Sequence, residues 1–266
     1  SQKETYGEPF RVFHQFKGSC VGQGAGQAAN TLMVVESILK KEQEEVKFPL
    51  FWLHAYGWSR KLAGWDSTGE GSFGSTMAKA LIEYGMFNND EFPSLPKAVI
   101  SAEGGLNWGA ENEIKYSAVK NHPAEWEGAG KKHLIGNAAQ IKSADEAHVA
   151  LANGYPMTIA SNWGGNMQCP VVEGVLLNSK RIFPWPHQMS VHGVWVHDKL
   201  GRIFYVINSW GQKAHGVCPT GAPVGGFWLQ EKDIDWICRN GECYALSAYQ
   251  GYPKRSDLLN WGELTW

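Results

Sequence analysis

The sequence predicts an α+β fold of two lobes, with helices in the first half of the chain and strands in the second. Apolar residues recur at helical spacing after Cys20 and again from Ser75 to Tyr84. Short apolar runs bounded by turn residues follow Pro156, as is typical of strands. Helices first and strands later favour an α+β architecture, and 266 residues suffice for one domain of two joined lobes. We expect a mainly helical lobe over about 16–130 and a mainly β lobe over 131–266, with the N-terminal strand crossing between them.

The first half of the chain shows one extended segment and four helical segments. Residues 6–20 are expected to be extended, with Phe10, Val12 and Phe13 directed into a core. A glycine-rich loop is expected over 64–74, and polar connections over 90–110 and 121–130. The expected helices are 20–41, one that starts at 48–56 with Pro49 in its first turn, 75–84 with Gly85 as its stop, and 111–120.

The second half begins with one short helix and continues as strands. Ser143 is suited to cap a helix over 143–153, and Glu146 stands at the capping-box position three residues later. The expected strands are 156–161, 171–177, 191–197, 202–208 and 226–230.

Composition and charge exclude several classes of function. The net charge of -2 gives no electrostatic reason to expect nucleic acid or an acidic membrane as a partner. No apolar run is long enough to span a bilayer. The first five residues contain no apolar core of a signal peptide, which fits either a chain that is not exported by that route or one numbered after processing. The compartment therefore stays unassigned.

Cysteine usage gives no support for a metal centre. Neither a CxxC pair nor an HExxH motif occurs, so we expect no metal and no cofactor. Five cysteines are an odd number, and at least one must be unpaired within the chain. Cys238 and Cys243 could close a short disulfide loop, but reduced thiols fit the same spacing.

Cys20 is the candidate nucleophile. Gly18 permits a sharp turn before it, and Ser19 is a suitable N-cap for the helix that follows. A thiol in the first turn of a helix meets the positive end of the helix dipole, which favours the nucleophilic thiolate. A small buried cysteine on a packed helix is the alternative, and the partners found later in the chain count against it.

Those partners are a histidine and an asparagine on two expected strands. His192 opens an apolar strand, and Asn208 ends the next strand beside Trp210. A lone histidine is more often a core or surface residue, and an asparagine at a strand end is usually a turn residue. Together, however, they supply what a cysteine nucleophile needs: an imidazole to take and return the proton, and an amide oxygen to orient that ring.

At this point the sequence resembles the papain-like cysteine peptidases. Three stretches carry the resemblance: Gly18-Ser19-Cys20, Ser190-Val191-His192-Gly193 and Asn208-Ser209-Trp210-Gly211, in the family's order of cysteine, histidine and asparagine. Gly226-Phe227-Trp228-Leu229 is similar to the strand that follows. The resemblance covers nearly the whole chain and looks most like bacterial or phage-type members. It implies a helical lobe and an antiparallel β-sheet or barrel lobe, with the active site in the cleft between them.

The resemblance also implies a role for each matching residue. Cys20 would be the nucleophile, His192 the general base and acid, and Asn208 the residue that orients the histidine. Gln15 would donate its side-chain N–H to the oxyanion hole, together with the backbone N–H of Cys20. Because Gln15 lies one residue closer to Cys20 than is usual in the family, His14 is a neighbouring candidate for the same role.

Further residues would bind substrate or protect the site. Trp210 would shield the contact between the histidine and the asparagine, while Gly71 and Ser72 would present backbone groups to an extended peptide. His187 and His197 are expected to lie elsewhere on the fold and to take no part in catalysis. The sequence departs from the family after the cysteine, where Val21 and Gly22 replace the usual aromatic residue.

The resulting prediction is a thiol peptidase that cleaves peptide bonds through an acyl-enzyme. Its partner would be a peptide or protein substrate. A different class of function is a peptidase fold kept as a binding or structural module in a larger assembly, such as a virus particle. A peptidoglycan-directed peptidase or amidase is a further alternative, since thirteen tryptophans would suit a glycan-bearing substrate.

Overall fold

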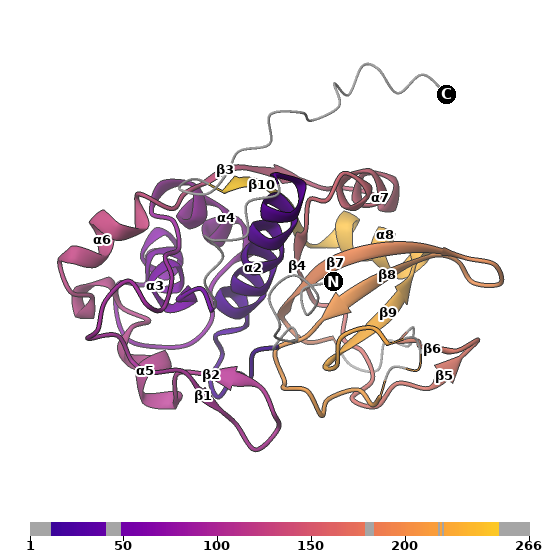
Figure 1. Cartoon of the computed structure of the whole chain (residues 1–266), viewed down its shortest axis with the longest axis horizontal. Coiled ribbons are helices and arrows are strands. Elements are labelled where there is room, and N and C mark those ends of the chain that lie inside the picture. Colours follow the sequence, from indigo (N-terminus) through magenta and orange to yellow (C-terminus); the bar gives the residue numbers. More distant parts are fainter. Residues whose placement is uncertain (1–11, 41–48, 179–183, 218, 220, 250–266) are drawn as a thin grey trace.

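The computed structural model describes residues 12–40, 49–178, 184–217, 219 and 221–249. Helices gather on one side of the molecule and a twisted antiparallel sheet lies on the other (Figure 1). The long helix α2 (Cys20–Lys40) runs between the two sides and contacts helix α3 (Trp52–Leu62) and strand β7 (His187–His197). The predicted α+β class with helices first and strands second is therefore confirmed.

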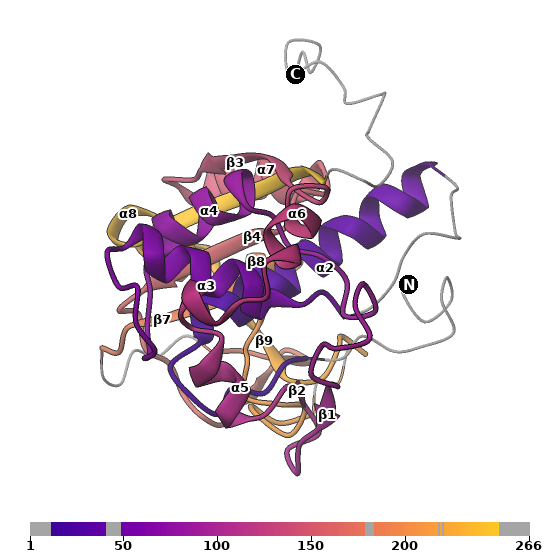
Figure 2. The same cartoon turned by 90° about the vertical axis from the view of Figure 1, so that its left-hand side faces the viewer.

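The helical side is assembled from short helices around α2, as the turned view in Figure 2 shows. A two-stranded ribbon of β1 and β2 lies at its edge. These elements are α3 (Trp52–Leu62), α4 (Gly74–Glu83), β1 (Val99–Ile100), β2 (Leu106–Asn107), α5 (Ala110–Lys115), the 3-10 turn η1 (Val119–Asn121) and α6 (Glu125–Gly130).

In the described part of the chain, the sheet has six antiparallel strands in the order β3-β10-β4-β7-β8-β9. Two helices, α7 and α8, pack against it, and a small hairpin of β5 and β6 lies beside β9. The elements are β3 (Ile135–Gln140), α7 (Ala144–Ala152), β4 (Met157–Ser161), β5 (Val171–Val172), β6 (Val175–Leu176), β7 (His187–His197), β8 (Gly201–Ile207), β9 (Gly226–Gln230), α8 (Glu231–Asn240) and β10 (Glu242–Tyr249).

Glycines on α2 bring its neighbours unusually close. A Cβ added at Gly22 would lie 2.5 Å from the ring of Trp52 on α3, and one at Gly24 would lie 3.2 Å from Gln188 on β7. Such a separation from an aromatic ring is far below van der Waals contact, so a side chain at Gly22 would displace Trp52. The ring of Trp52 thus fills the space beside Gly22, two residues after Cys20.

Each side of the molecule has its own hydrophobic core. On the helical side the core is aromatic. The ring centroid of Phe51 lies 5.7 Å from that of Phe87 and 5.0 Å from that of Trp126. On the sheet side it is built mainly from aliphatic strand residues such as Val191 and Ile203. Burial of each such side chain stabilises the fold by about 1.5–3 kcal/mol. The two cores make the two sides of the molecule rigid, and α2 lies between them.

Several predicted elements are confirmed within one or two residues. These are α2, α4, α7, β4, β8 and β9. Ser143 caps α7 as predicted, because its Oγ accepts the N–H of Glu146 at 3.2 Å, while Glu146 accepts the N–H of Lys142, one residue before the cap, at 2.7 Å. Val12 and Phe13 are buried as expected, while Phe10 lies outside the described residues.

Other predictions about the elements are wrong. The second helix starts at Trp52 rather than in the 48–51 stretch with Pro49, because Leu50 pairs with Asn88 in a β-bridge and Phe51 N–H donates to Phe87 C=O. The strand expected over 171–177 is a hairpin that turns at Glu173 and Gly174, both with positive φ. Helix 111–120 ends at residue 115, and the expected connection over 121–130 contains α6. Strands β3 and β10 and helix α8 were not predicted.

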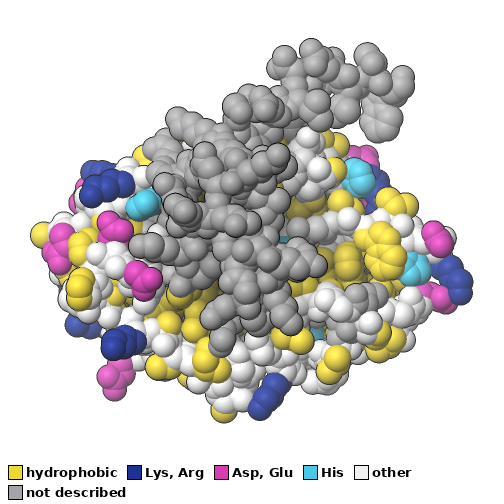
Figure 3. Space-filling view, in the orientation of Figure 1, with side chains coloured by type: hydrophobic (Ala, Val, Ile, Leu, Met, Phe, Trp, Pro, Cys, Tyr) yellow, Lys and Arg dark blue, Asp and Glu magenta, His cyan; other side chains and the backbone are white. Residues whose placement is uncertain are grey.

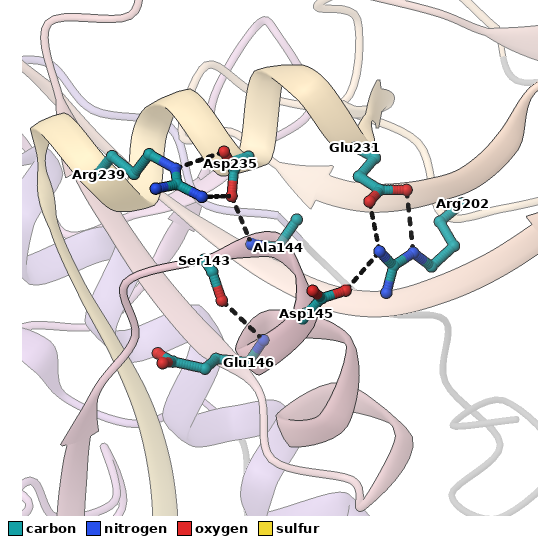
Figure 4. A network of polar contacts seen from close by, with 8 residues as sticks. All are labelled: Ser143, Ala144, Asp145, Glu146, Arg202, Glu231, Asp235 and Arg239. Carbon is teal, nitrogen blue, oxygen red and sulfur yellow. Dashed lines mark hydrogen bonds and ion pairs between the residues drawn. The ribbon is translucent and has the colours of Figure 1, made fainter.

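Ion pairs and a capping serine tie α7 to its neighbours (Figure 4). Arg202 on β8 contacts the carboxylates of Asp145 and Glu231. On the other side, Asp235 of α8 accepts the N–H of Ala144 at 3.2 Å and pairs with Arg239. These groups are largely exposed, so each pair contributes only about 0–1 kcal/mol and serves chiefly to set the orientation of the helices.

The surface in Figure 3 mixes charges of both signs among exposed apolar side chains. Within the described ranges, no helix has the length and apolarity that crossing a bilayer requires. Among the same residues, no group of three or more His, Cys, Asp or Glu side chains is arranged to hold a metal ion. Cys20, Cys169, Cys238 and Cys243 are free thiols, and Cys218 lies outside the described part.

Candidate active site

The thiol of Cys20 stands at the start of α2, on the wall of a cleft of about 540 Å³ between the two sides of the molecule. The loop before it turns at Gly18, whose C=O accepts the N–H of Gly71 at 2.6 Å. The first N–H groups of a helix have no partner inside the helix, and they form the positive end of its dipole. Cys20 therefore has the electrostatic surroundings that its position in the sequence predicts.

His187, at the first position of β7, is the imidazole beside this thiol. Its ring hydrogen-bonds the Cys20 side chain, and its Nε2 lies 2.7 Å from Oδ1 of Asn208. The ring of Trp210 stacks on that of His187, with centroids 5.1 Å apart and planes 27° apart. The expected arrangement of thiol, imidazole, amide and covering indole is present, but with His187 as the histidine.

Two neighbours fix the orientation of the Asn208 amide. Its Oδ1 accepts the N–H of Ser209 at 2.7 Å, and its Nδ2 lies 3.0 Å from Nε2 of His215. Burial lowers the pKa of His215 to about 4, so its ring is neutral above that pH and Nε2 can accept the Nδ2 N–H of Asn208. Oδ1 therefore faces His187 as an acceptor, so His187 Nε2 carries a proton and the other ring nitrogen is left for the thiol. His215 gave no signal in the sequence.

The electrostatics favour an ion pair between thiolate and imidazolium. Burial raises the pKa of Cys20, but the hydrogen bond and charge of His187 and the N–H groups of Gln188 and Val21 outweigh it, and the pKa lies below its usual value. For His187, burial lowers the pKa, while the contacts with Cys20 and Asn208 more than compensate and raise it. Each group thus stabilises the charged form of the other.

The prediction that His192 faces Cys20 is wrong. Its Nδ1 lies 2.6 Å from Oγ1 of Thr31 and its Nε2 lies 2.7 Å from Oγ of Ser190. Thr31 is the eleventh residue after Cys20, which corresponds to about 16 Å along α2. Burial lowers the pKa of His192 to about 3, so the ring is neutral and structural.

Strand register explains this difference. Ser190 pairs with Ile207 and Val191 with Val206, and the same register carries His187 to the level of Trp210, next to Asn208. A bulge between Val191 and Gly193 shifts the pairing beyond that point. The sequence spacing of His192 and Asn208 suits adjacent strands, but only the register shows which histidine meets the asparagine. His197 lies at the far end of β7, where its Nε2 contacts the backbone of Glu173.

Gln15 lies beside Ser209. Its N–H donates to Ser209 C=O at 2.8 Å, and its Oε1 accepts the Ser209 hydroxyl at 2.6 Å. With its oxygen occupied in this way, the side-chain amide has its two N–H groups left to donate elsewhere. His14 faces the carboxylate of Glu103, with 3.3 Å between Nδ1 and Oε2. The oxyanion role of either residue remains a prediction.

Gly71 and Ser72 both line the cleft, but their backbones differ in availability. The N–H of Gly71 donates to Gly18, and its C=O accepts Nη1 of Arg60 at 2.6 Å. Gly71 therefore cannot pair with a peptide as predicted, since its donor is already used inside the protein. Within the described part of the chain, the N–H and C=O of Ser72 have no hydrogen-bond partner, so the prediction is kept for Ser72.

The opposite wall of the cleft is formed by the end of β4 and the connection from α8 to β10. Glu242 is the one acidic or basic side chain among the described residues that line the cleft, apart from Cys20 and His187. Its carboxylate accepts the N–H and hydroxyl of Ser75 at 2.9 and 2.8 Å, at the start of α4. Phe73, 47% exposed, lies on the facing wall.

Comparison with known proteins supports the fold rather than a particular relative. No family model matches the sequence, and no curated protein is similar to it at a significant level. Solved structures do match. Xylellain, a cysteine protease from Xylella fastidiosa, aligns with a TM-score of 0.61 at 19% identity over 90% of this chain and 83% of its own.

Two further structures align over most of this chain. The bromelain protease from Ananas comosus has a TM-score of 0.54 at 14% identity, covering 94% of this chain and 96% of its own. The clostridial cysteine protease Cwp84 has a TM-score of 0.58 at 14% identity, covering 94% of this chain and 57% of its own. The chain therefore has the papain-like fold, and the predicted resemblance is confirmed at that level.

Proposed function

We propose that the chain is a cysteine peptidase in which Cys20, His187 and Asn208 perform the chemistry. The observation that carries the proposal is the continuous contact from the Cys20 thiol through the His187 ring to Asn208 Oδ1. Its position at a helix N-terminus in a cleft of a papain-like fold supports the same activity.

In the first half of the proposed reaction, the Cys20 thiolate attacks the carbonyl carbon of a peptide bond lying in the cleft. The resulting oxyanion would be stabilised by the N–H of Cys20, which has no partner among the described residues, and by the side-chain N–H of Gln15. The imidazolium of His187 then gives its proton to the leaving amine, and a thioester with Cys20 remains.

In the second half, neutral His187 takes a proton from water, and the hydroxide formed attacks the thioester carbonyl. Collapse of the second tetrahedral intermediate releases the acid and restores the thiolate beside the imidazolium. Asn208 and Trp210 keep the ring in position through both halves of the reaction. The amide oxygen accepts a hydrogen bond from Nε2–H of His187, and the indole covers that contact. An extended peptide would pair with the backbone of Ser72.

The alternatives considered from the sequence gain no observation of their own in the described part of the chain. A module that only binds would not need the lowered thiol pKa or the oriented imidazole. A peptidoglycan peptide would be cleaved by the same chemistry, so it is a choice of substrate rather than a different site.

Limiting iodoacetamide across pH, followed by peptide mapping, tests the ion pair directly. We expect Cys20 to be alkylated selectively, with a pH midpoint below ~8.5, the pKa typical of a free thiol. His187→Ala should move the pH midpoint of this alkylation upward. Cys20→Ser should abolish cleavage of a peptide library. Cys169 is the internal control, since burial raises its pKa to about 12. If Cys20 is no more reactive than Cys169 and no peptide is cleaved, the proposed function is wrong.

A further inference from the structure

The loop that delivers Cys20 is held by a carboxylate from a distant part of the chain. Glu113, on α5, accepts the backbone N–H of Phe16 at 3.2 Å and that of Lys17 at 3.1 Å. It also accepts the hydroxyl of Ser19 at 2.6 Å, immediately before the nucleophile. Glu113 is only 1% exposed, so these three donors replace the water that an exposed carboxylate would bind.

All three contacts donate a hydrogen bond to residue 113, so this position requires an acceptor. Ser19 Oγ accepts Nε2 of Gln23 at 2.9 Å and therefore directs its own proton toward Glu113. Both carboxylate oxygens receive a donor from the loop. An amide in the same place would turn an NH2 group against at least one of these donors.

A second carboxylate completes the restraint on the loop. Glu70 accepts the N–H of Gly18 at 2.7 Å, and the hydroxyl of Tyr56 donates to Gly18 C=O at 3.0 Å. Glu70, however, is exposed at the rim, whereas Glu113 is buried beneath the loop. The buried contact is therefore the one that solvent cannot substitute.

We propose that Glu113 is a positioning residue, which sets the backbone of residues 16–19 so that the Sγ and N–H of Cys20 meet His187 and the substrate carbonyl. This inference rests on the proposed function, because the geometry it maintains is that of the thiolate and the oxyanion donor. It assigns to α5 a role in catalysis that involves no contact with the substrate.

Hydrogen bonds from three donors favour the charged form of Glu113, whereas burial disfavours it. Burial raises its pKa, the hydrogen bonds from Ser19, Phe16 and Lys17 lower it, and the charge of Glu70 raises it again, with a net increase. A carboxyl whose pKa is raised on folding stabilises the fold below its normal pKa, and this contribution is lost as the pH rises through the folded value. Tyr56, Cys20 and Arg60 are the other titratable or charged groups near this cluster.

Glu113→Gln tests the proposal, with Glu111→Gln as the matched control on the exposed face of the same helix. We expect Glu113→Gln to move the pH midpoint of Cys20 alkylation upward and to lower kcat by about tenfold or more, with little change in KM, because small misplacements of reacting groups are costly. Amide hydrogen exchange at residues 16–19 should accelerate. Glu111→Gln should match wild type in every measurement.

Two further variants keep the test decisive. Ser19→Ala removes one of the three donors and should give a smaller change in the same direction. It also takes over the test if Glu113→Gln does not fold. Glu113→Asp keeps the acceptor charge and should recover part of the alkylation midpoint, which a role in packing alone would not produce.

The outcomes separate this inference from the proposed function. A selectively reactive wild-type Cys20 whose alkylation, kcat and loop exchange are unchanged in Glu113→Gln would overturn the role of Glu113 alone. An unreactive Cys20 in wild type would overturn the proposed function, and the catalytic role of Glu113 with it.

Discussion

Strand β7 carries three histidines, and two of them, His187 and His192, have opposite electrostatic behaviour. His187 faces a thiol and an asparagine, and its pKa is raised. His192 lies between two hydroxyl side chains inside the protein, and its pKa is lowered to about 3. Residue type and strand are the same, so the difference comes from what the surrounding elements place against each ring. An imidazole becomes a base for a nucleophile only where a charged partner offsets the penalty of burial.

The largest expected effect comes from mutating His187, with a variant of His192 as the comparison. We expect His187→Ala to lower kcat/KM for a peptide substrate by on the order of 10³, because the proton acceptor and donor are both lost. His192→Gln should leave the value within a few-fold of wild type, since that ring touches no reacting group. Steady-state kinetics on folded variants would measure both. Equal losses in the two variants would break the comparison.

A smaller loss is expected when the orienting partner is removed. Asn208→Ala takes away the acceptor for His187 Nε2 and leaves the ring free to turn under Trp210. We expect kcat to fall by about tenfold to a hundredfold, because the imidazole is still present but spends less time in the reactive orientation. The alkylation midpoint of Cys20 should rise with it. An unchanged midpoint would show that Cys20 alone holds the ring.

The two histidines should also affect stability in opposite directions with pH. The pKa of His192 is lowered on folding, so its contribution to stability is present above its unfolded value and is lost as the pH falls toward about 3. The pKa of His187 is raised, so its contribution is present below its unfolded value and is lost as the pH rises through the folded one. Denaturant unfolding at several pH values would measure this.

In that experiment, His192→Gln should flatten the acid side of the stability curve relative to wild type. His187→Ala should alter the neutral and alkaline side instead. Other buried histidines, such as His54 and His122, also have lowered pKa values, so only the difference between wild type and each variant is informative. The same shape of difference curve for both variants would contradict the assignment.

The smallest effect concerns the cleft that His187 faces. Glu242 places a carboxylate on its wall, and a basic substrate side chain lying there would be favoured. Because the site is open to solvent, we expect Glu242→Gln to reduce the rate for such a substrate by roughly twofold to fivefold relative to an apolar one. Competition between two peptides that differ at one position would measure the ratio. An unchanged ratio would place the substrate side chain elsewhere.

The fold and half of the site could be predicted from local sequence. Cys20 follows a turn residue and a serine of a type suited to cap a helix, and Asn208 closes an apolar run beside Trp210, so each position is visible within about ten residues. The cap at Ser143 was visible for the same reason. Strand β3 was not, because it carries alanine, glycine and polar residues that a single-sequence pattern assigns to loops, and β10 was not predicted either.

The sequence by itself therefore determined the position of Cys20, its helix and the order of helices before strands. Only the tertiary structure decided which histidine serves Cys20, because the choice depends on the pairing of β7 with β8 and on a bulge that shifts it. It also brought Glu113 beneath the nucleophile loop across more than ninety residues of chain. Propensity and capping act within a few residues, whereas register and long-range burial are set by the packing of the whole molecule.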